Sequence, residues 1–342
     1  MASNRRTCSF PPDKLMRARQ HAWIAVLCCT FLSPALTARA QGTADYPSRP
    51  VRIIVPFAAG ATTDTFTRAI GQHLMNRLKQ PMVIDNRPGA SQLIALEAVA
   101  KSAGDGYTLF LATQSGLVFL TGSRKKLPYD PVSDFSSVTL MYESPLYLLV
   151  RPDAPAKSVR ELIAWVRSQP GRLNYPSIGI GSTQHLAMEM FRTRANIDLM
   201  HIPYKGSPQI QAAFLGGEVQ IMFDGALSLP LVRSGKLRAL GSSGLERSQA
   251  TPELPTISEA GVPDFSMTSW FGLGAPAGVP RPLIDRLNHE VADYLRSPEG
   301  REKFASFNVD LKPSTPEQMA ERIRAEIPLY AKVMRAAGIE PE

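Results

Sequence analysis

The sequence predicts an α/β protein of two lobes, each a mostly parallel sheet flanked by helices, joined by two crossings of the chain. Two observations favour this fold class. From Asp45 onward, strand-like and helix-like segments alternate. These segments fall into two sets. The chain passes from the first set to the second near residue 145 and returns near residue 265. The expected domains are a first lobe of residues 41–144 and 266–342 and a second lobe of residues 145–265. A cleft between two lobes is a usual location for a small ligand.

The first 40 residues have the features of a secretory signal peptide. Arg5 and Arg6 begin a basic region, the apolar stretch Ala22–Leu32 follows, and an A-x-A cleavage signal stands at Ala38–Ala40. The apolar stretch is well short of the roughly 20 residues that span a bilayer. We therefore expect residues 1–40 to be removed on export to the periplasm.

The signal peptide also carries much of the net charge and all of the cysteines. Its removal takes away six of 38 cationic residues and one of 30 acidic residues, so the net charge falls from +8 to +3. No basic stripe remains to neutralise phosphates, which argues against a nucleic-acid partner. Cys8, Cys28 and Cys29 leave with the signal, so the mature chain has no disulfide.

Hydrophobic runs and amphipathic stretches predict the elements in order. In the first set we expect strands at 51–55, 81–84, 107–112 and 138–142. We also expect a helix whose apolar stripe runs from Phe66 to Leu78 and a second helix at 90–103. In the second set we expect strands at 146–150, 173–175, 199–202, 219–223 and 237–240, with helices at 158–168, 183–194 and from Ser207. A strand at 266–273 then leads to helices at 282–295, 298–306 and 316–336.

The segment 51–64 combines a buried strand, a loop of small residues and a helix start. Gly60 interrupts the regular secondary structure between the strand and the helix, and Thr62, Thr63 or Asp64 can cap the helix. Unpaired N–H groups and the positive end of the dipole make a helix start attractive to anions. An ordinary strand-to-helix turn has the same pattern, so this segment alone leaves both interpretations open.

A second segment of this kind spans residues 175–185. Gly179 and Gly181 permit close approach of the backbone, and Ser182 or Thr183 can cap the helix and offer a hydroxyl. The third glycine of a dinucleotide-binding motif is missing, so no nucleotide cofactor is expected. Because neither segment contains a lysine or arginine in its loop, we expect backbone N–H groups, hydroxyls, water and two helix starts to hold an anion.

Further candidate ligand contacts follow the carboxyl ends of predicted strands, where open α/β sheets place their ligands. Thr113, Gln114 and Ser115 follow the strand 107–112. Asp224 follows the strand 219–223, where it can bind a ligand or cap the next helix.

No catalytic motif supports an enzyme. The chain has no Gly-x-Ser-x-Gly elbow and no His-Glu-x-x-His motif. The four histidines of the mature chain, His73, His185, His201 and His289, are widely spaced, and we expect no metal site. A secreted hydrolase using Ser182 and His185 is an alternative, but no acid is placed to orient the histidine.

Eight blocks spread along the mature chain carry a family resemblance. They are Tyr46–Pro50, Asp85–Ala90, Asp105–Leu109, Lys126–Pro131, His201–Gly206, Met222–Asp224, Gly235–Leu240 and Trp270–Gly272. In these blocks the sequence resembles the Bug-type extracytoplasmic substrate-binding proteins of tripartite tricarboxylate transporters.

The resemblance implies a periplasmic binding protein of the venus-flytrap, type II-like fold. Such a protein closes on a small carboxylate and then meets membrane permease subunits. A sensor that presents its bound state to a membrane receptor is an alternative. We expect a monomer that is not an enzyme. The expected ligand-binding residues are Phe57, Ala59, Gly60, Thr62, Thr63, Asp64, Thr113, Gln114, Ser115, Ser177, Gly179, Gly181, Ser182, Thr183, His185 and Asp224.

Three loops depart from the family pattern. Ala58–Ala61 replaces Pro-Ala-Gly-Gly, Ser91–Leu93 stands where the family usually carries two glycines and an asparagine, and Thr113–Leu117 lacks the Ser/Thr-His pattern. Bulkier side chains beside the pocket would narrow it or favour a less polar acid.

Overall fold

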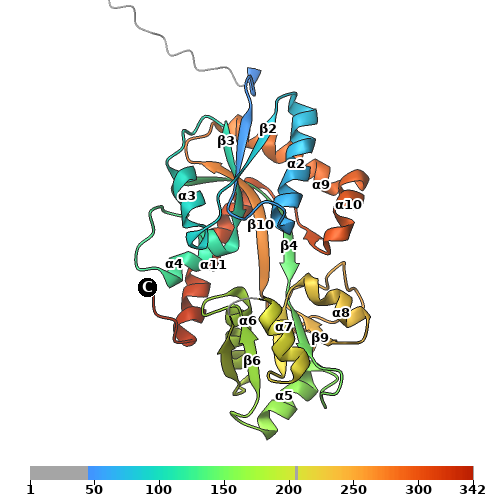
Figure 1. Cartoon of the computed structure of the whole chain (residues 1–342). Coiled ribbons are helices and arrows are strands. Elements are labelled where there is room, and N and C mark those ends of the chain that lie inside the picture. Colours follow the sequence, from blue (N-terminus) through green and yellow to red (C-terminus); the bar gives the residue numbers. More distant parts are fainter. Residues whose placement is uncertain (1–44, 205–206, 342) are drawn as a thin grey trace, which may run out of the picture. The chain divides into compact units, whose positions relative to one another are not determined.

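The computed structural model describes residues 45–204 and 207–341 (Figure 1). The expected signal peptide, residues 1–40, lies outside the described residues. None of the helices in the described part of the chain is both long enough and apolar enough to cross a membrane.

The larger sheet has six strands in the order β11-β4-β10-β3-β1-β2. Their bounds are β1 Val51–Val55, β2 Met82–Asn86, β3 Thr108–Thr113, β4 Phe135–Pro145, β10 Thr268–Pro276 and β11 Asp310–Leu311. β1 pairs in parallel with β2 and β3, so the loops at their carboxyl ends share one edge of the sheet.

Helices cover both faces of this sheet. They are α2 Thr62–Leu78, α3 Leu93–Ala100, α4 Leu120–Ser123, α9 Arg281–Arg296, α10 Pro298–Phe304 and α11 Pro316–Ala336. Val51, Ile53 and Val55 of β1 pack with α2, α9 and α10, whereas Ile54 packs with α3 and α11. The alternation is that of a strand buried on both faces.

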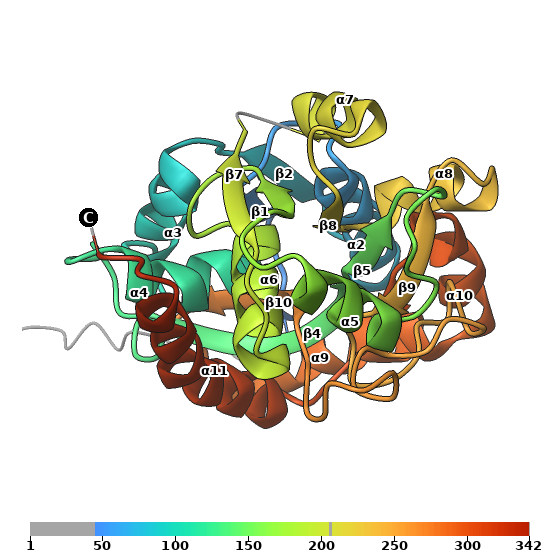
Figure 2. The same cartoon turned by 90° about the horizontal axis from the view of Figure 1, so that it is seen from below.

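The second set of elements forms two small sheets. The strands β5 Tyr147–Val150, β8 Ile221–Asp224 and β9 Arg238–Ser242 form an antiparallel sheet, and β6 Asn174–Ser177 pairs in parallel with β7 Met200–Pro203. The helices of this set are α5 Val159–Ser168, α6 Thr183–Ala195, α7 Ser207–Gly216 and α8 Leu229–Arg233. α11 packs against both β4 and α6, so it reaches the second set from the first (Figure 2).

The sheets are more mixed than the mostly parallel sheets that the sequence suggested. β4 and β10 run between the two sets and pair antiparallel with each other, from Phe135↔Pro276 to Pro145↔Thr268. Two strands that carry the chain out of the larger sheet and back into it run in opposite directions. Their mutual pairing is therefore antiparallel.

Two helix starts differ from expectation. The N-cap of α2 is Ala61, without a side-chain bond, so none of the expected capping residues occupies that position. The expected helix 90–103 begins only at Leu93, because Ala90, Ser91 and Gln92 all have positive φ.

Candidate functional site

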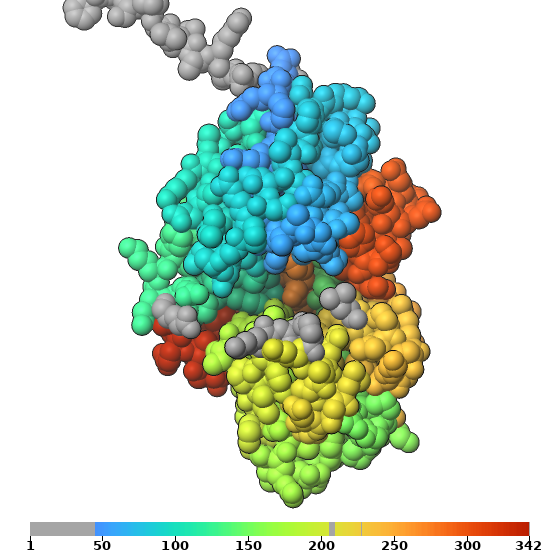
Figure 3. Space-filling model, viewed as in Figure 1, coloured from blue at the N-terminus to red at the C-terminus, as the bar shows by residue number. Residues whose placement is uncertain are grey.

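A cavity of about 620 Å³ lies between the carboxyl-end loops of the larger sheet and the loop that precedes α6. The surface is hollowed between the blue and cyan segments and the yellow part of the chain (Figure 3). The volume falls within the range of roughly 300–1,000 Å³ typical of small-molecule sites. The residues that line it are Phe57, Ser91, Gln92, Thr113, Gln114, Ser115, Phe119, Leu120, Ser123, Arg124, Ile178, Ile180, Gly181, Ser182, Thr183, Ser269, Trp270, Phe271, Gly338, Ile339 and Glu340.

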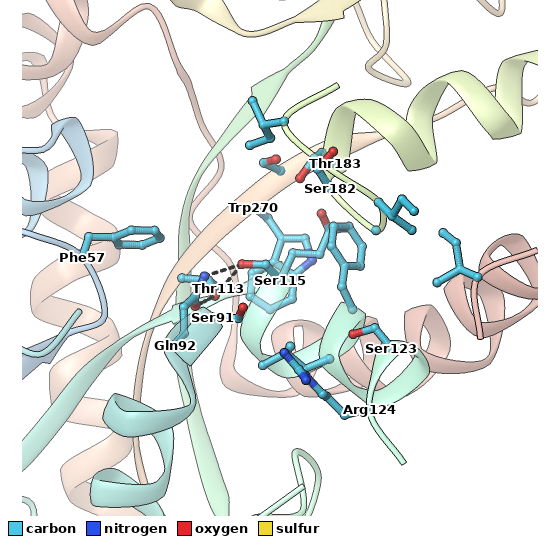
Figure 4. A pocket seen from close by; sticks show the side chains of 18 of the residues that line it. Phe57, Ser91, Gln92, Thr113, Ser115, Ser123, Arg124, Ser182, Thr183 and Trp270 are labelled. Carbon is cyan, nitrogen blue, oxygen red and sulfur yellow. Dashed lines mark hydrogen bonds between the residues drawn. The ribbon is translucent and has the colours of Figure 1, made fainter. Parts of the chain in front are cut away.

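A small polar network occupies one wall of this cavity (Figure 4). Gln92 Nε2 donates to Ser115 Oγ at 2.6 Å, and Thr113 Oγ1 donates to Gln92 Oε1 at 2.6 Å. Thr113 Oγ1 also accepts from the N–H of Gly116 at 3.0 Å. The hydroxyl of Ser115 has only a longer contact of 3.3 Å with Thr113 for its proton, so it can turn that proton toward a ligand oxygen.

The backbone beside this network is strained. Ala90, Ser91 and Gln92 have φ values of 43°, 53° and 80°, a left-handed conformation that costs L-residues roughly 1–2 kcal/mol each. Glycine adopts it without that cost, which fits the glycines of the family pattern at two of these positions. The two side-chain bonds of Gln92 hold the segment in place, and strain of this kind gathers at ligand sites.

The N-terminus of α6 faces the network from the opposite wall. Ser182 is the N-cap, and its side chain accepts from the N–H of His185 at 3.4 Å. Figure 4 shows Ser182 and Thr183 across the cavity from Ser115. The first N–H groups of a helix have no helical acceptor, so this end of α6 offers both hydroxyls and N–H donors to an anion.

Gly181 permits this arrangement. Its φ is 77°, and a Cβ built there would meet nothing within 4 Å. A larger residue would therefore be strained and would extend into open space.

His185 supports the loop from behind. It is buried, and its Nδ1 accepts from the N–H of Gly181 at 3.1 Å. Its ring stacks on that of His201, with 4.1 Å between the ring centroids. Burial, and then His201, lower the pKa of His185 to about 4, so the ring is neutral at pH 7. Ser177 Oγ lies 2.7 Å from His201 Nε2 and donates to the carbonyl of Gly179. This geometry does not support the hydrolase alternative. Among the described residues, the ring of His185 is hydrogen-bonded to the N–H of Gly181 and not to the hydroxyl of Ser182.

Asp64 likewise faces its own loop. Its carboxylate accepts from Gly60 N at 2.8 Å, Arg68 Nε at 2.9 Å and Asn86 Nδ2 at 2.9 Å. Burial raises its pKa, but these hydrogen bonds, that of Arg68 foremost, outweigh burial and hold the pKa below its usual value. These hydrogen bonds of the Asp64 carboxylate join β2 to the start of α2, so the carboxylate is not directed at a ligand.

A second cavity, of about 470 Å³, lies beside the start of α2. Gly60, Thr62 and Thr63 line it, together with Tyr142 and Phe271. Phe271 lines both cavities, so the two cavities are neighbours.

The carboxylate of Asp224 is hydrogen-bonded within the turn that follows β8. Its Oδ1 accepts from the N–H of Gly225 at 2.9 Å, and Ser228 Oγ donates to its Oδ2. Burial raises the pKa of Asp224 above its usual value. The N-cap of the helical turn that follows is Gly225, without a side-chain bond, so Asp224 does not occupy the capping position expected from the sequence.

Trp270 is fixed in the cavity wall by a network centred on α11. Its Nε1 donates to Glu326 Oε2 at 2.7 Å, and Gln114 Nε2 donates to the same oxygen at 2.9 Å. Arg322 Nε donates to the other oxygen of Glu326 at 2.7 Å, and Arg322 also pairs with Glu143 of β4. One buried charge cluster therefore joins α11 to both strands that connect the two sets of elements.

The structure brings ten of the sixteen expected residues to one or other cavity. The first cavity takes Phe57, Thr113, Gln114, Ser115, Gly181, Ser182 and Thr183, and the second takes Gly60, Thr62 and Thr63. The expected residues that line neither cavity are Ala59, Asp64, Ser177, Gly179, His185 and Asp224.

Sequence reasoning missed part of the lining. Ser91 and Gln92 follow the carboxyl end of β2, a signal that the strand-end rule could have used. Ser123, Arg124 and Ile339 come from segments with no ligand-binding pattern. Within residues 45–204 and 207–341, no group of three or more His, Cys, Asp or Glu side chains could hold a metal ion.

Comparison with known proteins supports a family assignment. Residues 66–339 match the family model described as "Tripartite tricarboxylate transporter family receptor". BugT of Bordetella pertussis is 35% identical over 310 residues, which cover 90% of this chain and 95% of the relative.

Two solved structures from Rhodopseudomonas palustris have the same fold. Rpa4515, solved with adipate, is 36% identical with a TM-score of 0.73, over 87% of this chain and all of that chain. MatC, solved with bound malate, is 32% identical with a TM-score of 0.67, over 84% of this chain and 99% of that chain. These likenesses confirm the predicted α/β fold class of a two-lobe periplasmic binding protein.

Proposed function

Because the chain belongs to the tripartite tricarboxylate transporter receptor family, we propose that it captures a small carboxylate between two lobes and delivers it to membrane permease subunits of such a transporter. In this proposal the first lobe comprises residues 41–144 and 266–342 and the second comprises residues 145–265. The protein acts in the periplasm, is not an enzyme and needs no cofactor.

One observation carries the proposal. The hydroxyl of Ser115 and the start of α6, with Ser182 and Thr183, face each other across one cavity. A carboxylate between them accepts from both walls and lies at the positive end of the helix dipole. The adipate and malate seen in two relatives at 36% and 32% identity are carboxylates of suitable size.

These contacts supply enough free energy without an ion pair. Hydrogen bonds to a charged group contribute about 1.5–3 kcal/mol each, and a partly buried helix end contributes up to about 2 kcal/mol. Three such bonds and the helix end therefore reach the roughly 8 kcal/mol that micromolar binding requires.

Calorimetric titration with mono-, di- and tricarboxylates tests the binding step. We expect at least one of them to bind with micromolar affinity. Ser115→Ala and Thr183→Ala should each weaken binding about tenfold, or 1.4 kcal/mol. The matched control Ser168→Ala, on the exposed end of α5, should leave the affinity unchanged. Absence of binding by every carboxylate, or equal affinities in all three variants, would refute the proposed site.

Co-purification tests the partner. The ligand-loaded protein should retain permease subunits from solubilised membranes, and the ligand-free protein should retain fewer. Recovery of a membrane receptor in place of a permease would favour the sensor alternative.

A further inference from the structure

The loop before α6 presents two large apolar side chains to the first cavity. Ile178 and Ile180 line it, and they are 44% and 69% exposed. They alternate with Gly179 and Gly181, so no neighbouring side chain in the loop covers them. Exposed side chains of this size inside a cleft favour a ligand that removes them from water.

The opposite wall is apolar as well. Phe57, Phe119, Leu120, Trp270 and Phe271 line it. Phe57 and Phe271 are partly exposed, whereas Trp270, Leu120 and Phe119 are buried behind them and hold this surface in place. Apolar side chains therefore meet the ligand from both sides of the cavity.

Polar groups that suit a carboxylate are gathered in one place. Ser115 and its neighbours face Ser182 and Thr183, whereas Ser123 and Arg124 lie apart from them, away from Phe57 (Figure 4). Arg124 already takes part in an interaction of its own. The charged side chains among the described lining residues are Arg124 and Glu340, which have opposite signs. The lining thus offers one group of uncharged donors for a carboxylate, and its two charged side chains add no net positive charge for a second one.

From this division we propose that the ligand is an amphipathic monocarboxylate. Its single carboxylate lies between Ser115 and the start of α6, and its aliphatic or aromatic body lies between the rings of Phe57 and Phe271 and the isoleucines Ile178 and Ile180. The inference rests on the proposed function and narrows it to one class of acid.

Titration of the full mature chain with matched acids tests this class. Hexanoate and adipate have the same length and differ by one carboxylate, and 3-phenylpropanoate adds an aromatic body. We expect hexanoate and 3-phenylpropanoate to bind at least tenfold more tightly than adipate. Tighter binding of adipate would overturn this inference and leave the proposed function intact. Failure of all three acids, and of every other carboxylate, would overturn the proposed function as well.

A variant at the apolar wall provides the second test. Ile180→Asn should weaken 3-phenylpropanoate about tenfold and change the affinity for adipate by less than threefold. Leu245→Asn is the matched control, because Leu245 is 72% exposed and lines neither cavity. Both residues are exposed, so both variants should unfold at the wild-type temperature. Equal affinity of Ile180→Asn and Leu245→Asn for 3-phenylpropanoate would refute the placement of the ligand body.

Discussion

Replacing Glu326 by glutamine should destabilise the protein by about 2–3 kcal/mol. One carboxylate oxygen accepts from Arg322 Nε at 2.7 Å, and the other accepts from Trp270 Nε1 and Gln114 Nε2 at 2.7 and 2.9 Å. A glutamine side chain has one acceptor oxygen. Its NH₂ group must therefore face either Arg322 or the pair Trp270 and Gln114, all of which are donors. If the oxygen stays with Trp270, Arg322 loses a charge-assisted bond worth about 1.5–3 kcal/mol. The side chains of Arg322 and Glu326 are 25% and 13% exposed, so water replaces this bond poorly.

Thermal unfolding measures the effect. In a chain of this size a loss of 1 kcal/mol lowers Tm by about 2 °C, so we expect Glu326→Gln to melt about 4–6 °C below the wild type. Glu321→Gln is the matched control, because Glu321 lies on the same helix and is exposed. It should stay within about 1 °C of the wild type. Equal melting temperatures for the two variants would refute the role assigned to this charge cluster.

Three further predictions follow from the loops around the first cavity. Since Gln92 has a φ of 80°, Gln92→Ala keeps a strain that Gln92→Gly relieves. Urea unfolding should therefore show the alanine variant less stable than the glycine variant by about 1 kcal/mol, and equal stability would contradict the strain. The folded state favours the neutral ring of His185, whose pKa is about 4 against an ordinary 6.5. This contribution is fully present above pH 6.5 and is lost as the pH falls toward 4, by up to about 3 kcal/mol. His185→Gln should flatten the dependence of unfolding free energy on pH in this range. The control His289→Gln, at an exposed position, should leave that dependence unchanged. An unchanged slope in His185→Gln would refute the assignment of this pH dependence to His185. Gly181→Val should abolish carboxylate binding in calorimetry while the far-ultraviolet circular dichroism stays that of the wild type, and retained binding would show that this loop does not contact the ligand.

Much of the order of elements could be predicted from the sequence. The strand 51–55 and the helix 316–336 have the same bounds in the structure. In both, hydrophobic periodicity and a local signal agree, and Thr315 with Gln318 forms a full capping box at the helix start.

Other parts of the fold depend on contacts that periodicity does not contain. The helical segment from Ser115 to Ser123 was not predicted, because its buried residues Gly116–Leu120 are consecutive and show no amphipathic spacing. The pairing of β4 with β10 joins residues more than 120 positions apart, and an apolar run does not specify its partner strand.

The candidate site, like the fold, was predicted only in part from the sequence. Rules for strand ends and helix starts found Thr113, Ser115 and Thr183, which line the cavity. The same rules named Asp64 and His185, whose polar atoms bind their own loops. Position in a loop indicates that a residue is near the ligand edge, but the direction of its side chain depends on partners elsewhere in the fold.

The antiparallel pairing of β4 with β10 has a mechanical consequence. Two strands cross-linked by hydrogen bonds resist stretching and sliding along their length, but they bend across their flat face. The ladder is interrupted between Phe271 and Gly272 and again between Leu273 and Gly274, where a bulge weakens the pairing and lets the strands curve. At both steps β10 also pairs with β3, so this curvature lies inside the larger sheet. Bending between the two sets of elements should therefore concentrate at Thr268–Trp270, beyond the pairing with β3, and occur about a single axis that crosses both strands. The residues on either side of the cavity would then approach along one arc, and their relative orientation would be preserved throughout the movement.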